Sequence, residues 1–321
     1  MTVSWNRTLL QLLAACLGYL CVYAWLVRAE RRALAGLTLS GDRRWGPLWP
    51  LVDVLRALGT RTSAQFGRTL LGPLLGLALA LAALLLLPVG PALMVGGFRL
   101  WAPFSTWDPD LLSLAALGLA SALGTWLTGA LSPSAGVREG AHATVSRALA
   151  HAAPGLLALS GAALVTGEFS VAGLVRWQNA SWPLALYQPL GLLLSALCAV
   201  LSGRRLPARD DVPEPCLLDF HLQHAGRGWA IAHLSEYLTL LYASAVIALV
   251  YLGGCDVPTG FGLPGLAAKT LLVLLALLWL RQRWYRVWRQ RYEAHALPLL
   301  LALGALNLLV TAAALIWRST L

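Results

Sequence analysis

Long apolar stretches recur along the chain and alternate with shorter segments that hold most of the charged residues. Each stretch is about twenty residues long, which lets a helix cross the hydrocarbon core of a bilayer. Because backbone polar groups in lipid must be hydrogen-bonded within their own segment, the stretches predict helices rather than strands. The pattern predicts about eight membrane-spanning helices, at residues 8–27, 69–95, 110–131, 143–167, 183–202, 229–253, 262–280 and 296–317. We therefore expect an all-α fold, a polytopic membrane helical bundle that forms one integral membrane domain over residues 1–321.

One segment between the first two spans has a different periodicity. In Pro47–Leu58, leucines at positions 48, 51, 55 and 58 lie on one face of a helix. A short helix with one apolar face is typical of a segment that lies on the membrane surface or packs beneath a partner. We predict a short amphipathic helix here rather than a solvated loop.

Composition and charge support a membrane protein and orient it. Hydrophobic residues make up 58% of the 321 positions and charged residues 12%, far from the balance of a soluble domain. The net charge of +10 comes from arginines between the spans. Nineteen of them lie in or beside alternate connections and four on the other side, so the positive-inside rule places the odd-numbered connections in the cytoplasm and both termini outside. No aromatic residues are interleaved with a basic face, so we expect no nucleic-acid partner.

The five cysteines do not form a metal-binding pattern. No CxxC pair and no other metal-ligand spacing occurs, and most of the cysteines lie in apolar segments, where a thiol behaves as a small hydrophobic group. They are Cys16, Cys21, Cys198, Cys216 and Cys255. We predict no metal and no iron–sulfur cluster in this chain.

Two charged residues lie within predicted spans and are candidate functional groups. Glu236 lies about two turns into the sixth span, and His233 lies three residues before it on the same helical face. A carboxylate at that depth is protonated, paired or in contact with water. Lys269 lies inside the seventh span. The sequence leaves open whether Lys269 pairs with Glu236, relays charge to it or does neither.

Acidic residues also gather next to the membrane. The connection at residues 204–228 holds four carboxylates and two histidines, Asp210, Asp211, Glu214, Asp219, His221 and His224. Such groups are able to load or relay protons, and histidine titrates near neutral pH; a solvated, charge-balanced loop is the alternative. At the end of the first span, Glu30 is followed by Arg31 and Arg32. Paired with arginine, this carboxylate should stay ionised, which favours an organising role over proton transfer.

Several stretches together resemble the complex I subunit 1 family, the bacterial H subunit, which includes the membrane anchors of group 4 energy-converting hydrogenases and of formate hydrogenlyase. The resemblance covers most of the chain in the family's order. It is carried by ERRALAGL from Glu30, RRWGP from Arg43, PLVDVLRAL from Pro50, SRALAHAAPGLLALSGAALVTGEFSVAGLVRWQ from Ser146, VPEP from Val212, FHLQHAG from Phe220, HLSEY from His233, and LLALGALNLLVTAA from Leu300.

The resemblance implies a non-catalytic membrane subunit of an oxidoreductase or translocase complex. Such a chain docks a peripheral electron-transfer arm, whose iron–sulfur and catalytic subunits hold the clusters, and couples redox chemistry to ion movement through antiporter-like membrane subunits. It holds no cofactor of its own, with a quinone as a possible ligand, and belongs in a bacterial inner membrane. By resemblance, the arm interface or quinone-like chamber contains Glu30, Arg31, Arg32, Asp53 and Arg147. The proton path contains Asp210, Asp211, Glu214, Glu236 and Lys269.

The chain departs from the quinone-reducing members at three places. His151 and Ala152 stand before Pro154 where those members have a Tyr-Glu pair, Gln223 and His224 stand where a Glu-Tyr pair is usual, and the loops are shorter. These departures favour a hydrogenase-type anchor. A quinone-binding subunit is the close alternative, and a free-standing transporter and a purely structural anchor are two others.

Overall fold

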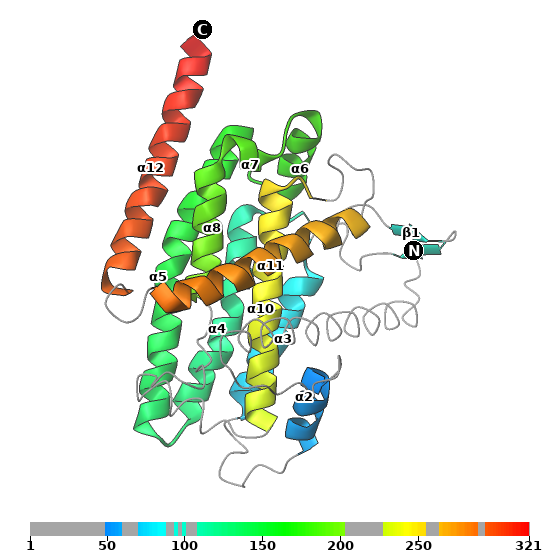
Figure 1. Cartoon of the computed structure of the whole chain (residues 1–321), viewed down its shortest axis with the longest axis vertical. Helices are drawn as coiled ribbons and strands as arrows, with labels where there is room; N and C mark the ends of the chain where they lie inside the picture. Colours follow the sequence, from blue (N-terminus) through cyan, green and yellow to red (C-terminus); the bar gives the residue numbers. More distant parts are fainter. Residues whose placement is uncertain are drawn as a thin grey trace. The chain divides into compact units, whose positions relative to one another are not determined.

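The protein consists almost entirely of helices wherever its structure is described. The computed structural model describes residues 49–59, 70–87, 93–95, 98–100, 108–202, 227–254, 263–287 and 293–320. The helices are α2 (Trp49–Gly59), α3 (Leu71–Leu85), α4 (Leu111–Leu131), α5 (Ala135–Thr166), α6 (Val171–Ala180), α7 (Leu184–Tyr187), α8 (Pro189–Ser202), α10 (Arg227–Tyr251), α11 (Leu263–Val287) and α12 (Glu293–Thr320). Two short strands, β1 (Leu93–Val95) and β2 (Phe98–Leu100), form one antiparallel pair (Figure 1).

The prediction of a helical membrane bundle is confirmed. Within the described residues, α4, α5, α10 and α12 are long and apolar enough to cross a membrane, and α3 and α8 are shorter apolar helices. The predicted amphipathic helix is present as α2. The predicted span at residues 8–27 lies outside the described residues.

The predicted second span is wrong in its second half. Helix α3 ends at Leu85, and residues 93–95, which fall within the predicted span, form strand β1. The sequence between them contains Pro88, Gly90 and Pro91. Proline lacks the backbone donor that a helix interior requires, and glycine lowers helix propensity, so the helix ends although the sequence stays apolar.

The predicted fifth span is two helices rather than one. Helix α7 is a single turn, and α8 begins at Pro189 after Gln188, whose backbone departs from helical geometry with φ −133° and ψ 62°. Proline is favoured at the first position of a helix, where its missing N–H would have no partner in any case. The break places a polar amide between two apolar helices, and its position matters below.

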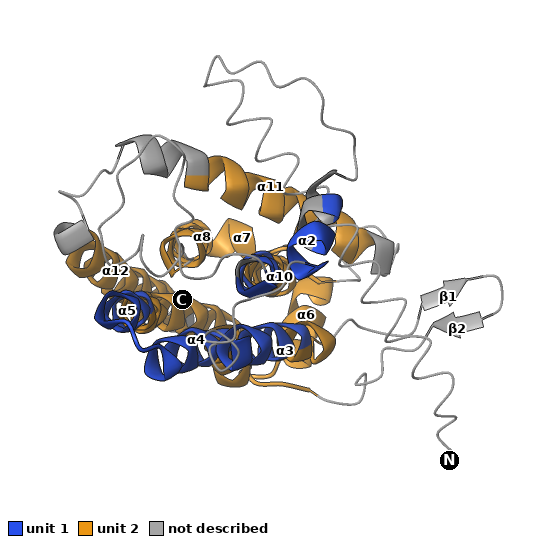
Figure 2. Cartoon of the chain, turned by 90° about the horizontal axis from the view of Figure 1, so that it is seen from below, with its two compact units in different colours: residues 1–81, 121–144, 205–238 blue, residues 82–120, 145–204, 239–321 orange. Residues whose placement is uncertain are grey.

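The chain divides into two compact units, which Figure 2 distinguishes by colour. Unit 1 contains residues 1–81, 121–144 and 205–238, and unit 2 contains residues 82–120, 145–204 and 239–321. Helices α3, α4, α5 and α10 each contribute residues to both units.

In unit 1, α3 and α4 approach each other at glycines. A Cβ added to Gly124 would lie 2.3 Å from the Gly76 nitrogen and 2.6 Å from the Gly72 oxygen, which are backbone atoms. A Cβ on Gly72 would lie 2.1 Å from Thr128 Oγ1. Small residues are what let two membrane helices bring their backbones together. Unit 1 also fixes α2, because the Arg227 Nε donates to the Leu58 carbonyl at 2.6 Å, near the end of that helix.

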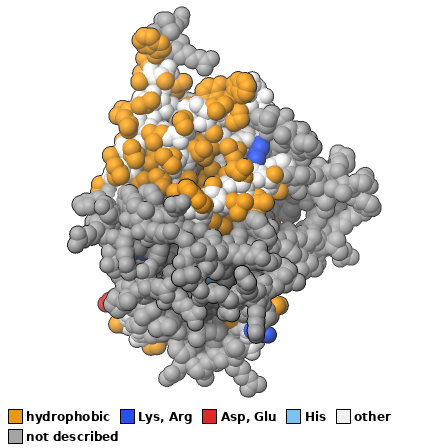
Figure 3. Space-filling view, in the orientation of Figure 1, with side chains coloured by type: hydrophobic (Ala, Val, Ile, Leu, Met, Phe, Trp, Pro, Cys, Tyr) orange, Lys and Arg blue, Asp and Glu red, His pale blue; other side chains and the backbone are white. Residues whose placement is uncertain are grey.

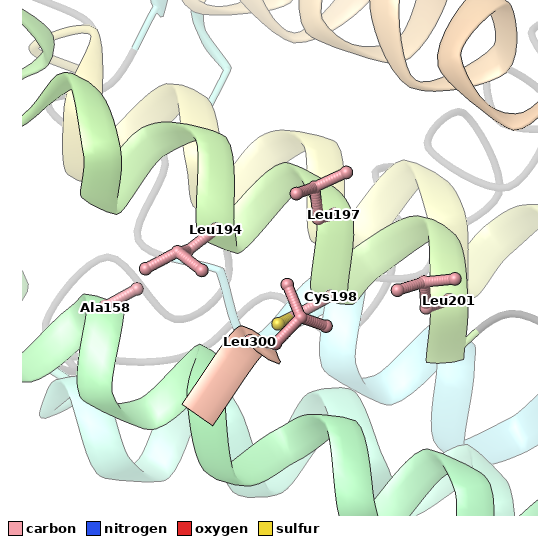
Figure 4. Packing of buried hydrophobic residues seen from close by; sticks show 6 residues of the cluster. All are labelled: Ala158, Leu194, Leu197, Cys198, Leu201 and Leu300. Carbon is pink, nitrogen blue, oxygen red and sulfur yellow. The ribbon is translucent and has the colours of Figure 1, made fainter. Parts of the chain in front are cut away.

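In unit 2, α8 packs against α7, α11 and α12. Its buried face joins α5 and α12 in one hydrophobic cluster, shown in Figure 4, which consists of Ala158, Leu194, Leu197, Cys198, Leu201 and Leu300. Helix α12 approaches α5 closely, since a Cβ on Gly304 would lie 2.9 Å from Leu157 Cδ1. The last helix is therefore held by tight contacts at particular residues as well as by its apolar surface.

Unit 2 also presents a large apolar surface. Hydrophobic side chains cover the upper part of the face in Figure 3, where α12 and α7 lie. The exposed residues of α12 are Leu299, Leu306, Leu309, Val310, Ile316 and Trp317. A surface of this kind is incompatible with water and typical of contact with lipid or with other membrane chains.

Candidate functional site

Helix α10 is the most enclosed of the four long apolar helices. Of its apolar window, 83% is buried, against 33% in α4, 39% in α5 and 22% in α12. A charged side chain on such a helix is shielded from lipid and from bulk water by the rest of the protein. Polar residues of α10 are therefore the first candidates for function.

Glu236 is the carboxylate on this helix. It is 6% exposed, and among the described carboxylate side chains it alone is buried, because Asp108, Asp110, Glu139 and Glu168 are all exposed. His233, one turn earlier, is also 6% exposed, and its ring lies 4.9 Å from that of Tyr237 at an interplanar angle of 35°. The predicted pair of polar residues on one face is thus present and buried.

Small and hydroxyl-bearing residues line unit 1 around the same part of α10. A Cβ on Gly76 would lie 3.4 Å from Ser235 Oγ and 3.3 Å from the Ser121 carbonyl, so α3, α4 and α10 meet there. Thr125 and Thr128 of α4 are each 1% exposed, and Thr128 donates its hydroxyl to the Gly124 carbonyl at 2.8 Å. The sequence prediction missed these residues because serine and threonine are common in membrane helices, and only the packing shows that they surround α10.

The structure describes only part of the predicted interface and path. Glu30, Arg31, Arg32, Asp210, Asp211 and Glu214 lie outside the described residues. Asp53 lies on α2 in unit 1. Arg147 lies on the part of α5 that belongs to unit 2 and is partly buried. Their roles remain predictions.

Lys269 of α11 interacts with the end of α10. Its Nζ donates to the Gly254 carbonyl at 2.9 Å, and Gly254, with φ 55°, lies just beyond the last residue of α10, Tyr251. A cation near a helix C-terminus is favourable because the unpaired carbonyls there carry partial negative charge. Glu236, in contrast, belongs to the N-terminal half of α10.

His151 of α5 makes a backbone contact. Its Nδ1 lies 2.8 Å from the Arg147 carbonyl. Because a carbonyl only accepts, this geometry places the proton on Nδ1. Three residues later, Pro154 lies inside the helix and lacks an N–H to donate. His151 is 9% exposed, so this position is buried and polar although it lacks the Tyr-Glu pair.

Unit 2 contains buried amides that the sequence prediction did not single out. Gln178 of α6 donates to the Val250 carbonyl at 3.0 Å and accepts from the Leu184 N–H at 3.0 Å. Gln188 donates from Nε2 to Thr311 Oγ1 on α12 at 2.6 Å. Asn307, one turn before Thr311, is 4% exposed. An uncharged amide within an apolar stretch is the signal that would have identified Asn307.

No group of three or more His, Cys, Asp or Glu side chains is placed to hold a metal ion within the residues that the structure describes. The polar chemistry found there consists of one buried carboxylate with its histidine and tyrosine neighbours, hydroxyl groups and amides. These groups exchange protons or bind water, and they sit in long apolar helices. The protein is a multi-pass membrane protein with a polar interior.

Comparison with known families places the chain more narrowly. Residues 10–312 match the family described as NADH dehydrogenase. The match covers most of the chain, and the chain belongs to this family. The resemblance inferred from the landmark stretches is therefore confirmed at the level of the family.

Named relatives of similar length agree. Subunit 8 of the NADH-quinone oxidoreductase of Thermus thermophilus is 28% identical over 316 residues, which cover 94% of this chain and 85% of that protein. A membrane subunit of the NADH-quinone oxidoreductase of Syntrophotalea carbinolica is 28% identical over 310 residues, covering 93% of each chain.

A solved structure has the same fold. A chain of the membrane-bound sulfane sulfur reductase, described as an archaeal respiratory membrane complex, aligns with a TM-score of 0.71. The alignment covers 94% of this chain and 99% of that one at 17% sequence identity. At that identity the likeness establishes the fold alone.

Proposed function

We propose that this chain is a membrane subunit of a multi-subunit, redox-driven complex, in which it docks a peripheral electron-transfer arm and couples electron transfer to ion movement. The family match over residues 10–312 carries the proposal. The named relatives are subunits of NADH-quinone oxidoreductases. The buried Glu236 supports coupling, because an intramembrane carboxylate is costly and typical of ion pathways.

The residue roles follow from the same proposal. Glu30, Arg31, Arg32, Asp53 and Arg147 contact the arm, and Asp210, Asp211, Glu214, Glu236 and Lys269 belong to the path along which charge enters the membrane. Iron–sulfur clusters and catalytic metals belong to the arm subunits, and antiporter-like chains are the membrane partners. This chain performs no redox chemistry itself.

Purification of the tagged chain in a mild detergent, followed by mass spectrometry, tests the proposal. We expect iron–sulfur subunits and large antiporter-like chains to co-purify. A stable chain that purifies alone and transports an ion or solute after reconstitution would contradict the proposal and establish a free-standing transporter.

The orientation is a separate part of the proposal. We place the chain in a bacterial inner membrane with the connection between α4 and α5 in the cytoplasm, because arginines concentrate in that set of connections. Asn179 and Glu139 are both exposed, and they lie on opposite sides in this topology.

Single cysteines at these two positions check the orientation in a chain without its native cysteines. In intact cells, a membrane-impermeant maleimide should label Asn179→Cys and leave Glu139→Cys unlabelled until the membrane is permeabilised. The reverse pattern would show that the topology is inverted.

Quinone binding is a second candidate, because the relatives named above belong to quinone oxidoreductases. The fold neighbour is a chain of a sulfane sulfur reductase, and the landmark positions at His151 and Ala152 depart from the quinone-type pattern. We therefore favour an anchor that uses no quinone.

A photoreactive quinone analogue distinguishes the two candidates. We expect the active, purified complex to show no labelling of this chain that excess unmodified quinone suppresses. Competable labelling of peptides from this chain would instead establish the quinone-binding function, with a subunit of a known quinone oxidoreductase as the positive control.

A further inference from the structure

Two buried amide groups of unit 2 face each other without a hydrogen bond. Gln188 Oε1 and Asn307 Nδ2 are both inaccessible to solvent and have no partner. Their side chains belong to residues that are only 2% and 4% exposed. A buried, unsatisfied acceptor or donor costs about 1–3 kcal/mol, so a pair of them at one place calls for a ligand that satisfies both.

Gly161 of α5 fixes how far apart these two atoms are. A Cβ on Gly161 would lie 2.6 Å from Asn307 Nδ2 and 2.8 Å from Gln188 Oε1. Both atoms therefore lie within hydrogen-bonding range of one common point, and their separation is at most the sum of the two distances. One water molecule spans a gap of that size, whereas a side chain at position 161 would fill it.

The neighbouring contacts hold the Gln188 amide in place. Its Nε2 donates to Thr311 Oγ1 at 2.6 Å, so the Oε1 stays directed away from Thr311. Thr311 in turn donates to the Asn307 carbonyl at 2.7 Å. Because the Thr311 hydrogen is committed to that carbonyl, its hydroxyl only accepts from Gln188, and turning the Gln188 amide over would lose this bond.

A second polar group borders the same place but is already satisfied. The Tyr251 hydroxyl donates to the Ala158 carbonyl at 3.1 Å and accepts from Ser195 Oγ at 3.1 Å. A Cβ on Gly191 would lie 3.2 Å from that hydroxyl and 3.0 Å from Gln188 Oε1. The tyrosine thus closes one side of the site and leaves the two amides as its open hydrogen-bonding groups.

We infer that Gly161, Gln188 and Asn307 form a binding site for a single water molecule inside the helical bundle, where the water bridges Gln188 Oε1 and Asn307 Nδ2 and fastens α12 to α8. Water is the matching ligand because it accepts from the amide N–H and donates to the amide oxygen at once. It also satisfies the site if the Asn307 amide is turned over, since water donates twice. The inference is independent of the proposed function.

Cryo-electron microscopy of the full chain, together with the partners with which it purifies, tests the site at a resolution where ordered waters are visible. We expect one density peak within hydrogen-bonding distance of Gln188 and Asn307 in the wild type. The peak should be lost in Gly161→Ala, whose Cβ displaces the amides. It should remain in the matched control Gly155→Ala on the same helix, whose Cβ meets Cys198 Cβ at an ordinary 3.7 Å.

Two results would overturn the inference, and the wild-type protein alone is sufficient to obtain them. One is a map in which the Gln188 and Asn307 amides bond directly with no peak between them. The other is a peak that disappears when sodium is replaced by choline, which would identify a cation rather than water. A peak that persists without sodium supports the water site.

Discussion

Replacing Glu236 with glutamine is expected to abolish redox-driven ion translocation by the assembled complex, down to the level of uncoupled membranes. Glutamine has nearly the same size and still forms hydrogen bonds, but it does not release a proton. Because Glu236 is the buried carboxylate of the most enclosed helix, no change of similar size elsewhere in the described residues removes a charge from the interior. Glu236→Asp, which keeps the charge on a shorter side chain, should retain part of the activity.

Inverted membrane vesicles allow both quantities to be followed together, with electron transfer measured by substrate consumption and ion uptake by a pH-sensitive dye or by ²²Na⁺. Glu139→Gln is the matched control, because Glu139 is an exposed carboxylate on α5. It should leave translocation unchanged. Normal ion uptake by Glu236→Gln, in a complex that still contains all its subunits, would show that Glu236 has no part in coupling.

Gly124→Ala is expected to have the largest effect on stability. The new Cβ would lie 2.3 Å from the backbone nitrogen of Gly76 and 2.4 Å from its Cα. Backbone atoms in the middle of a helix do not move aside cheaply, so α3 and α4 must separate and lose contacts along their interface. We expect a loss of about 3 kcal/mol, at the upper end of typical overpacking.

Thermal unfolding of the purified protein in lipid nanodiscs measures this effect as a lowered midpoint. Gly59→Ala serves as the control, since its Cβ would meet nothing within 4 Å, and it should leave the midpoint unchanged. An unchanged midpoint for Gly124→Ala would mean that α3 and α4 are farther apart than these distances require.

The helices could be predicted from the sequence, because apolar length alone determines what is stable in lipid. The span predicted at 110–131 is α4, and the one predicted at 229–253 is α10, each within two residues. Errors arose where apolar composition and backbone chemistry disagree. Pro88 and Pro91 end α3 within an apolar run, and Gln188 separates α7 from α8.

The candidate site was only partly predictable, for a different physical reason. Glu236 is identifiable because a carboxylate within a span is costly wherever it points. Gln188 and Asn307 lie more than a hundred positions apart in the sequence, and each is individually tolerable in a membrane helix. What makes them a site is that Gly161 brings both amides to one point, and this depends on packing between three helices rather than on any local pattern.

The unequal burial of α10 and α12 bears on how the protein is made. Helix α12 is the more apolar of the two and keeps most of its surface exposed, so it has the properties of a segment that partitions into lipid on its own as it leaves the translocon. Helix α10 carries His233 and Glu236, which lipid disfavours. Its insertion is therefore expected to depend on α3, α4 and α5, which are synthesised first, and truncations that remove them should leave α10 outside the bilayer.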